Sequence, residues 1–181
     1  FGHHGQPAGT APIIEVPEVE CVAGKGLRGD RFFGWKEDYK GQVTFFEEEQ
    51  YERLCEKFAV THLPPSVFRR NIITRGVDLN TLIGVEFEVQ GIRFLGTQES
   101  TPCYWMNQAF AEGAEAALKG HGGLRAKMLS LTHKNLPLAI FLEKADLGYP
   151  AWSGSTTQKV SNSDIISALG IGVVRFNDIT E

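Results

Sequence analysis

The sequence predicts a mostly β protein with a few helices (α+β), arranged as a partly closed antiparallel β-barrel. Three observations carry this prediction. Strand-like segments outnumber helix-like segments along the 181 residues, and the clearest pair of strand-like segments has the pattern of an antiparallel hairpin. No Walker pattern follows a strand-like segment, and the GxGxxG spacing of Gly24, Gly26 and Gly29 leads into a loop and a strand rather than a helix, so neither a dinucleotide-binding fold nor a P-loop fold is indicated.

The first third of the chain is predicted to hold two strands and one helix. Residues 13–22 are rich in Ile and Val and form a strand made irregular by Pro17, which has no backbone N–H to donate. The glycine-rich run 24–31 forms a loop, and residues 42–46 form the next strand. Residues 47–58 follow as a helix, because acidic residues occupy its first turn and apolar residues recur at helical spacing.

The middle of the chain continues with strands and one longer helix. Residues 68–74 have extended character, and residues 85–89 and 92–95 form a hairpin around a Gln-Gly turn, with acidic side chains on one wet face. Residues 104–119 contain several alanines and are predicted as one helix, which a glycine-rich run ends. Residues 124–129 then form a strand.

The last fifty residues carry weaker signals. An apolar strand is predicted within residues 137–143, a polar linker over residues 153–161, a short helix from Asn162 or Ser163 to Leu169, and a final strand at residues 173–176.

Charge and composition exclude several classes of function. The net charge of −4 and the spread of acidic residues along the chain give no basic surface for nucleic acid. No apolar run approaches the ~20 residues that span a bilayer, and the N-terminus has no signal-peptide pattern. Cys21, Cys55 and Cys103 form no CxxC pair and leave one thiol unpaired in any disulfide scheme, which indicates a reducing, cytoplasmic location.

Cys103 is the main candidate for chemistry. It follows Pro102 at the junction between a strand-like and a helix-like segment. Unpaired N–H groups at a helix N-terminus stabilise a thiolate, which is both a nucleophile and a soft metal ligand. The alternative is a buried, inert thiol. That alternative is preferred for Cys21 and Cys55, which are predicted to belong to the core.

Six segments in order resemble the MOSC domain family, named for the C-terminal domain of molybdenum-cofactor sulfurases. The segments are Gly26-Leu27-Arg28-Gly29-Asp30-Arg31-Phe32-Phe33-Gly34, Gln42-Val43-Thr44, Arg70-Asn71-Ile72, residues 76–84, Thr101-Pro102-Cys103, and His121-Gly122-Gly123-Leu124-Arg125-Ala126. The resemblance implies a MOSC-type β-barrel domain over residues 1–130. Residues 131–181 match no family pattern and are expected to be a C-terminal extension that packs on the same domain, since exposing its apolar side chains costs about 1.5 to 3 kcal/mol each.

The resemblance implies that Cys103 ligates molybdenum of the pterin cofactor or carries sulfur. A thiolate suits both roles, as a soft metal ligand and as the acceptor of sulfane sulfur. By the same resemblance the Asp30-Arg31 loop and Arg70-Asn71 lie near this pocket. Because arginine binds anionic oxygens in bidentate fashion, Arg31 and Arg70 are predicted to contact the phosphate or pterin of molybdopterin.

Each of these residues also has a structural alternative. In the structural alternative, Asp30 and Arg31 only brace a surface turn. Arg69 and Arg70 would then be a solvated pair on an edge strand, and Asn71 would satisfy local backbone groups. The structural alternative is preferred for Arg69. A solvent-exposed loop position is preferred for His121, and an ordinary acidic helix start is preferred for residues 47–49.

Three functions are consistent with these residues. In the first, the protein binds molybdenum cofactor through Cys103 and reduces N-oxygenated compounds with electrons from a separate partner protein. In the second, Cys103 carries a persulfide received from a sulfur-donor protein and passes it on for cofactor assembly. The third is a non-catalytic binding module. Pyridoxal phosphate chemistry is not expected, because the sequence contains no aminotransferase-like module. Many family members have a histidine after the Gly-Asp-Arg segment, where this chain has Phe32 and Phe33, so a proton-transfer role at that position is not expected.

Overall fold

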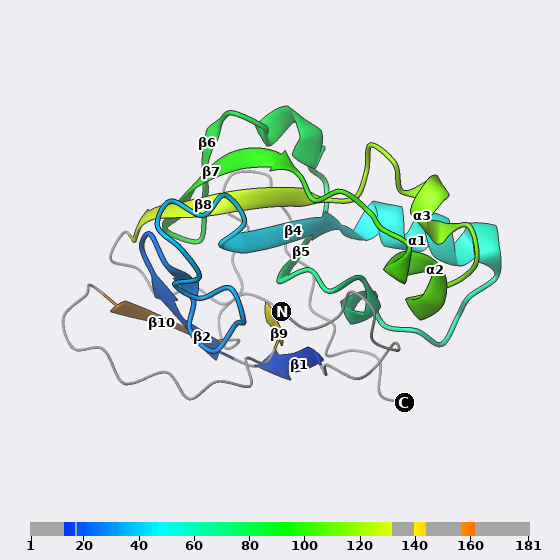
Figure 1. The fold of residues 1–181 in the computed structure, drawn as a ribbon, viewed down its shortest axis with the longest axis horizontal. Helices are drawn as coiled ribbons and strands as arrows, with labels where there is room; N and C mark the ends of the chain where they lie inside the picture. The colour runs from blue at the N-terminus through cyan, green and yellow to red at the C-terminus, as the bar shows by residue number, and fades with distance from the viewer. Residues whose placement is uncertain (1–12, 17, 132–139, 144–156, 162–181) are drawn as a thin grey trace.

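The computed structural model describes residues 13–16, 18–131, 140–143 and 157–161 and folds them into two β-sheets with three short α-helices. The larger sheet has the strand order β1-β9-β5-β4-β8-β7-β6, and the smaller one has the order β10-β2-β3. A hydrogen bond from the Gly24 N–H to the Met128 carbonyl, 2.8 Å long, ties the β2–β3 turn to strand β8 of the larger sheet. The curled, strand-rich fold confirms the predicted partly closed α+β barrel (Figure 1).

The strands and helices have these bounds: β1 Ile13–Val16, β2 Glu18–Val22, β3 Gly26–Leu27, β4 Val43–Glu47, α1 Glu48–Phe58, β5 Ile72–Thr74, β6 Glu86–Val89, β7 Ile92–Glu99, α2 Trp105–Ala109, α3 Ala114–Ala117, β8 Leu124–Leu131, β9 Ile140–Glu143 and β10 Thr157–Ser161. Two 3-10 turns, η1 at Pro65–Phe68 and η2 at Leu79–Leu82, flank strand β5 along the chain.

One neighbouring pair of strands corrects the expectation of antiparallel pairing. Strands β4 and β5 run parallel, with Phe45 opposite Ile72, because helix α1 and turn η1 carry the chain back to the starting end of the sheet. The other pairings in both sheets are antiparallel. Strand β5 lies between β4 and β9, so Arg70 and Asn71 lead into an interior strand rather than an edge strand.

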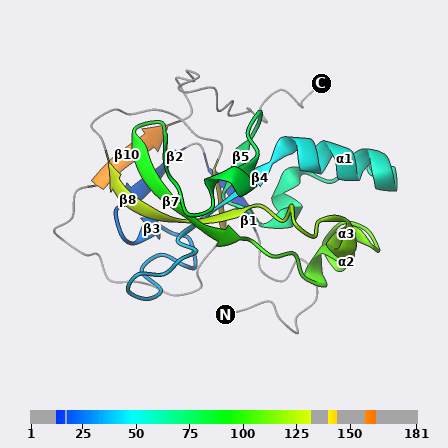
Figure 2. The same cartoon turned by 90° about the horizontal axis from the view of Figure 1, so that it is seen from above.

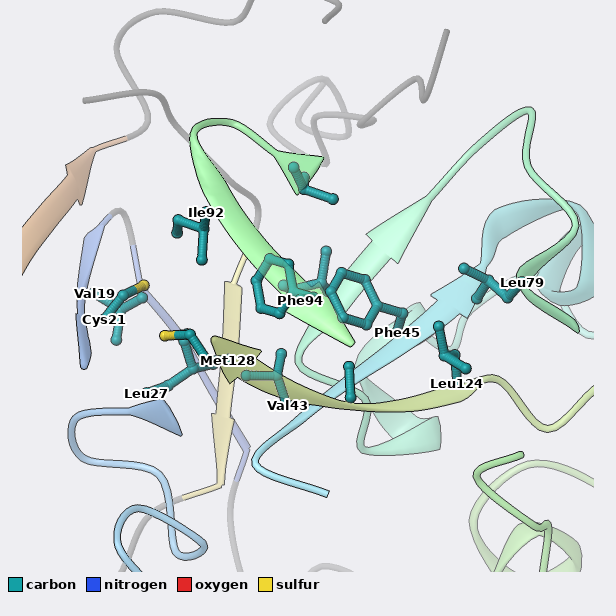
Figure 3. Packing of buried hydrophobic residues seen from close by; sticks show 13 residues of the cluster. Val19, Cys21, Leu27, Val43, Phe45, Leu79, Ile92, Phe94, Leu124 and Met128 are labelled. Atoms are coloured by element: carbon teal, nitrogen blue, oxygen red, sulfur yellow. The ribbon is translucent and has the colours of Figure 1, made fainter. Parts of the chain in front are cut away.

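Side chains on the two faces of strand β4 belong to two separate apolar cores. Val43 and Phe45 point into the barrel, where Phe45 meets Phe94 edge-on at 5.2 Å between ring centroids (Figure 3). Phe46 points to the opposite face and joins a second core with the three helices and η1. In both ribbon views the helices gather at one end of the larger sheet, and β2 and β10 lie at the other (Figure 1 and Figure 2). Thr44, on the same face as Phe46, lines a cavity instead of a core.

The predicted helix over residues 104–119 is wrong. Two short helices, α2 and α3, replace it, and residues 110–113 separate them. Gly113 has a φ of +89°, in the left-handed region that an α-helix does not use. A flexible glycine in the middle of an alanine-rich stretch therefore breaks the helix instead of being accommodated in it.

The predicted hairpin is confirmed. Strands β6 and β7 pair with Val89 opposite Ile92, and the Gln90-Gly91 turn has φ values of +53° and +75°. Positive φ at both central residues is the type I′ geometry that matches the twist of two-residue hairpins. Glu86 and Glu88 are exposed, as expected for the wet face.

Two other predictions need correction. The strand predicted over residues 13–22 is two strands in different sheets, one ending at Val16 and the other beginning at Glu18. Residues 157–161, predicted as part of a polar linker, form strand β10 and pair with β2. The helix predicted up to Leu169 and the strand predicted at residues 173–176 lie outside the described residues. The division of the chain at residue 130 stays a prediction, although β9 and β10 both pair with strands from the first part.

None of the described helices combines the length and the apolar character that a membrane span needs.

Cys21 lies in the barrel core and links stability to pH. Burial, and to a smaller extent the Glu20 carboxylate, raises the pKa of the Cys21 thiol to about 12, whereas a thiol in an unfolded chain ionises near pH ~8.5. The folded protein therefore keeps a proton that the unfolded chain loses, so the stability from this group is complete below about pH 8.5 and falls as the pH rises toward 12.

We therefore expect the free energy of unfolding, measured with urea from about pH 8 to 11, to fall more steeply in the unaltered protein than in Cys21→Val. Tyr51, whose pKa is also raised to about 12, contributes equally to both proteins. Equal slopes in the two proteins would contradict the assignment to Cys21.

Candidate functional site

A cavity of about 180 Å³ opens on the outer face of the larger sheet, between the β3–β4 loop and the segment that carries Cys103. Among the described residues, four arginines reach its wall, namely Arg31, Arg69, Arg70 and Arg125, and Asp30 is the one carboxylate. The other lining side chains that matter here are polar or aromatic: Thr44, Asn71, Ser100, Thr101 and Cys103, with Phe32, Tyr39, Phe68 and Trp105. The cavity is therefore predominantly cationic, and it contains one thiol.

The floor of the cavity is a row of polar residues across three chain segments. Arg125 on β8 lies opposite Thr44 on β4, and the Asn71 N–H donates to the Thr44 carbonyl at 3.1 Å. The neighbouring positions, Leu124 and Phe45, face the barrel core instead. Because side chains alternate along a strand, the apolar core dictates that Arg125, Thr44 and Asn71 share the outer face.

Asp30 and Asn71 are joined in a buried hydrogen-bond network. The Asn71 Nδ2 donates to Asp30 Oδ2 at 3.0 Å, and Asn71 Oδ1 accepts from the Thr44 N–H at 2.9 Å and from Thr44 Oγ1 at 2.8 Å. Asp30 Oδ1 accepts from the Phe32 N–H at 2.8 Å. The network ties the β3–β4 loop to the sheet, so the predicted turn brace is present, but it is buried rather than on the surface.

Arg70 is buried, in contrast to the solvated pair considered from the sequence. Its side chain is part of the cavity wall, yet Nε, Nη1 and Nη2 donate to the carbonyls of Gly122, Phe68 and Ser100 at 3.0, 2.8 and 2.8 Å. Three of its donor nitrogens thus hold backbone that belongs to three different segments.

Arg69 and Arg31 enter the cavity from different loops. Arg69 has a φ of +59°, an uncommon conformation for a residue with a side chain, and its guanidinium lies 6.0 Å from the Trp105 ring. Arg69 ends η1 in this left-handed conformation. The backbone turns there, so the side chains of the adjacent residues Arg69 and Arg70 point in different directions. The guanidinium of Arg31 lies 4.3 Å from the ring of Phe32.

Arg125 is the site residue that sequence reasoning missed. Its Nε is buried and has no hydrogen-bond partner among the described residues. The available signal was the alternation of β8, in which apolar Leu124, Ala126 and Met128 bracket Arg125 and Lys127. Alternation therefore indicates a cation on the outer face, two residues after a double glycine, but it does not indicate that this cation lines the same cavity as Cys103.

Cys103 is half-buried and lies on the cavity wall. Its carbonyl accepts from the Met106 N–H at 2.9 Å. Helix α2 has only five residues, so the helix-terminus effect expected from the sequence is weak here. What distinguishes this thiol is its place in a cavity with several guanidinium groups.

The remaining thiols and candidates lie elsewhere. Cys21 is fully buried in the barrel, as predicted, whereas Cys55 is only half-buried at the edge of the second core. His121 is exposed, as expected. The described part of the chain contains no cluster of three or more His, Cys, Asp or Glu side chains that could hold a metal ion.

The acidic run at residues 47–49 is structural. The carboxylates of Glu47 and Glu49 accept from the N–H groups of Leu79 and Gly76 at 2.8 and 2.7 Å, and Glu48 Oε2 binds Arg75 Nε at 2.7 Å. These contacts fasten the loop after β5 to the start of α1.

Comparison with solved structures shows the same fold at low sequence identity. The YuaD protein from Bacillus subtilis superposes with a TM-score of 0.52 and 17% identity, over 70% of this chain and 82% of YuaD. YiiM from Escherichia coli superposes with a TM-score of 0.50 and 16% identity, over 79% of this chain and 73% of YiiM. At such identities the likeness concerns the fold alone.

Sequence comparison places the chain in a family that carries no functional description. No curated protein matches the sequence. Residues 74–175, more than half of the 181, match a family model. The chain belongs to the family described as a domain of unknown function, DUF8193.

Proposed function

We propose that this protein is a MOSC-type domain that binds molybdenum cofactor, with Cys103 as the protein ligand of the metal. The observation that carries the proposal is that Cys103 and Arg125 line the same cavity, where the Arg125 Nε has no acceptor among the described residues. A buried donor without an acceptor costs free energy, and an anionic ligand removes that cost.

The side chains that line the cavity suit both the metal and the phosphate group of the molybdenum cofactor. A cysteine thiolate is a soft ligand for a thiophilic metal, and guanidinium groups bind phosphate oxygens in bidentate fashion. Arg31, Arg69 and Arg125 supply positive charge from three separate segments of the chain. When bound, the cofactor supplies a redox-active metal centre, and these residues hold its phosphate and orient it toward Cys103.

The other lining residues contribute enclosure and rigidity. The rings of Phe32, Tyr39 and Trp105 cover part of the wall and reduce access of water, which strengthens charge interactions inside. The Asp30–Asn71 pair anchors the loop that carries Arg31 and fixes its approach to the cavity. In the enzymatic form of the proposal, an N-oxygenated compound is reduced here with electrons from a separate donor protein.

The size of the cavity favours a second candidate. A volume of about 180 Å³ is below the roughly 300 to 1,000 Å³ of common organic-ligand pockets, but it accommodates a persulfide. In this role the Cys103 thiolate attacks the outer sulfur of a persulfide donor. The donor's S–S bond breaks, the donor leaves as a thiolate, and Cys103 keeps the transferred sulfur in a new S–S bond, with no external oxidant or reductant.

Metal analysis of protein from a host that makes molybdenum cofactor tests the proposal, with Cys55→Ala as matched control. The cofactor role predicts about one molybdenum per chain in the unaltered protein and in the control, and a loss of at least about tenfold in Cys103→Ala, because changes to residues that only orient a metal ligand already cost about 10- to 100-fold in metal affinity. A metal-free protein that gains the mass of one sulfur atom at Cys103 after treatment with a persulfide donor supports the carrier role instead. Failure of Cys103 to react with iodoacetamide in the folded protein contradicts both.

A further inference from the structure

The segment that leads to Cys103 is pressed against the Gly122-Gly123 turn. The Ser100 N–H donates to the Gly123 carbonyl at 2.7 Å, and the Gly122 N–H donates to Glu99 Oε1 at 3.1 Å. A Cβ on Gly122 would lie 2.4 Å from the Ser100 carbonyl oxygen and 2.7 Å from Pro102 Cδ. Such separations are too short for non-bonded atoms, so only glycine allows the two segments to meet this closely.

Arg70 holds both sides of this contact. Its Nη2 donates to the Ser100 carbonyl at 2.8 Å and its Nε donates to the Gly122 carbonyl at 3.0 Å. The third bond, from Nη1 to the Phe68 carbonyl at 2.8 Å, anchors the guanidinium to its own segment. The planar fork of an arginine matches two carbonyls at a fixed separation, which a lysine ammonium, a compact point charge, does not do.

Only two residues separate Ser100 from Cys103, and one of them is Pro102, whose φ is locked by its ring. The position of the Ser100 carbonyl is therefore transmitted over a short and stiff connection to the Cys103 thiol. We infer that Arg70 is a positioning residue that sets where the Cys103 sulfur lies in the cavity by binding the Ser100 and Gly122 carbonyls together. The inference rests on the proposed function of Cys103 as the reacting group.

This assignment separates the arginines of the cavity by role. Arg70 binds the protein's own carbonyls and stabilises the wall, whereas Arg31, Arg69 and Arg125 are the proposed contacts of the ligand. The prediction from the sequence that Arg70 contacts phosphate or pterin is replaced here by an action through Cys103.

The test measures the alkylation rate of Cys103 by iodoacetamide, resolved by peptide, in protein free of cofactor. Arg70→Met removes the fork and Arg70→Lys retains the charge. Arg53→Met is the matched control, because Arg53 also donates to a backbone carbonyl, that of Ala117 at 3.0 Å, but on the exposed surface. The half-buried Cys55 serves as reference thiol within each protein.

We expect Arg70→Met to raise the Cys103 rate about tenfold or more, because local opening exposes the thiol, and to change the Cys55 rate less than about twofold. Arg70→Lys should restore part of the difference, and Arg53→Met should leave both rates unchanged. An unchanged Cys103 rate in folded Arg70→Met, or an equal rise at Cys55, overturns the inference, since the latter indicates general loosening.

Hydrogen exchange on the unaltered protein keeps the inference testable even if Arg70→Met does not fold. The Ser100 amide should be protected as strongly as the paired amides of β7 and β8, and exchange at the rate of an unprotected amide would overturn the inference. Both measurements use protein without cofactor. A protein without molybdenum would therefore contradict the proposed function and leave the positioning role standing. An unchanged alkylation rate of Cys103 in folded Arg70→Met would contradict the positioning role and leave the proposed function standing.

Discussion

Asn71→Asp is expected to destabilise the protein by about 3 to 5 kcal/mol at neutral pH, although the two side chains have almost the same shape. The substitution replaces the Nδ2 donor that binds Asp30 Oδ2 at 3.0 Å with a second carboxylate oxygen. Both side chains are buried, so water screens their repulsion little. Acidification should recover part of the loss, because one protonated carboxyl can donate to the other.

Urea unfolding at about pH 8 and about pH 5 measures the effect. Asn80→Asp is the matched control, since Asn80 is exposed and its Nδ2 also holds a single acceptor, the Gly120 carbonyl at 2.8 Å. The control should lose less than about 1 kcal/mol at either pH. A loss in Asn71→Asp that is small, or the same at both pH values, would show that the Asp30–Asn71 contact is not the junction between loop and sheet.

Gly123→Ala is expected to cost about 3 to 5 kcal/mol in the free energy of unfolding, for two reasons that add. Gly123 has a φ of +95°, which residues with a side chain rarely adopt. An added Cβ would also lie 2.2 Å from the Phe45 carbonyl oxygen, which belongs to the central strand and cannot move away freely. The substitution therefore strains the junction of β4, β8 and the segment that carries Cys103.

The control for this prediction separates backbone strain from collision. Gly120 has a similar φ of +79°, but a Cβ there would have no neighbouring atom within 4 Å. Gly120→Ala should cost only about 1 to 2 kcal/mol, the penalty of the left-handed backbone. Urea unfolding compares the two variants, and equal losses would mean that the close approach to Phe45 contributes nothing.

Much of the fold was predictable because local rules and the apolar core agree. The β6–β7 hairpin followed from alternation and a Gln-Gly turn, and the place of Cys21 in the core followed from its strand. The prediction of one helix over residues 104–119 was wrong, because Gly113 adopts a left-handed backbone conformation that composition alone does not reveal. The expectation of antiparallel pairing was wrong for β4 and β5, because their parallel direction depends on the path that α1 and η1 take through space.

Cys103, Arg31 and Arg70, which the sequence and the resemblance single out, all line the cavity, and their roles there stay predictions. Cys103 stood out from its local sequence and from the MOSC resemblance. Arg70 was predicted as a ligand contact, yet two of its acceptors, the Ser100 and Gly122 carbonyls, lie 30 and 52 residues away along the chain. The place of Arg125 in the site does not follow from its local sequence, because its position opposite Thr44 is a matter of strand register.

The sequence by itself determined the class of fold, the short hairpin, the core thiol and the candidate thiol, since each depends on neighbours within a few residues. Only the tertiary structure decided which of the arginines that line the cavity holds backbone carbonyls. The physical reason is that guanidinium donors are satisfied by whichever carbonyls or anions the folded chain brings near them. For Arg70 those are carbonyls of the Cys103 segment and the Gly122-Gly123 turn, and for Arg125 no protein acceptor among the described residues reaches its Nε.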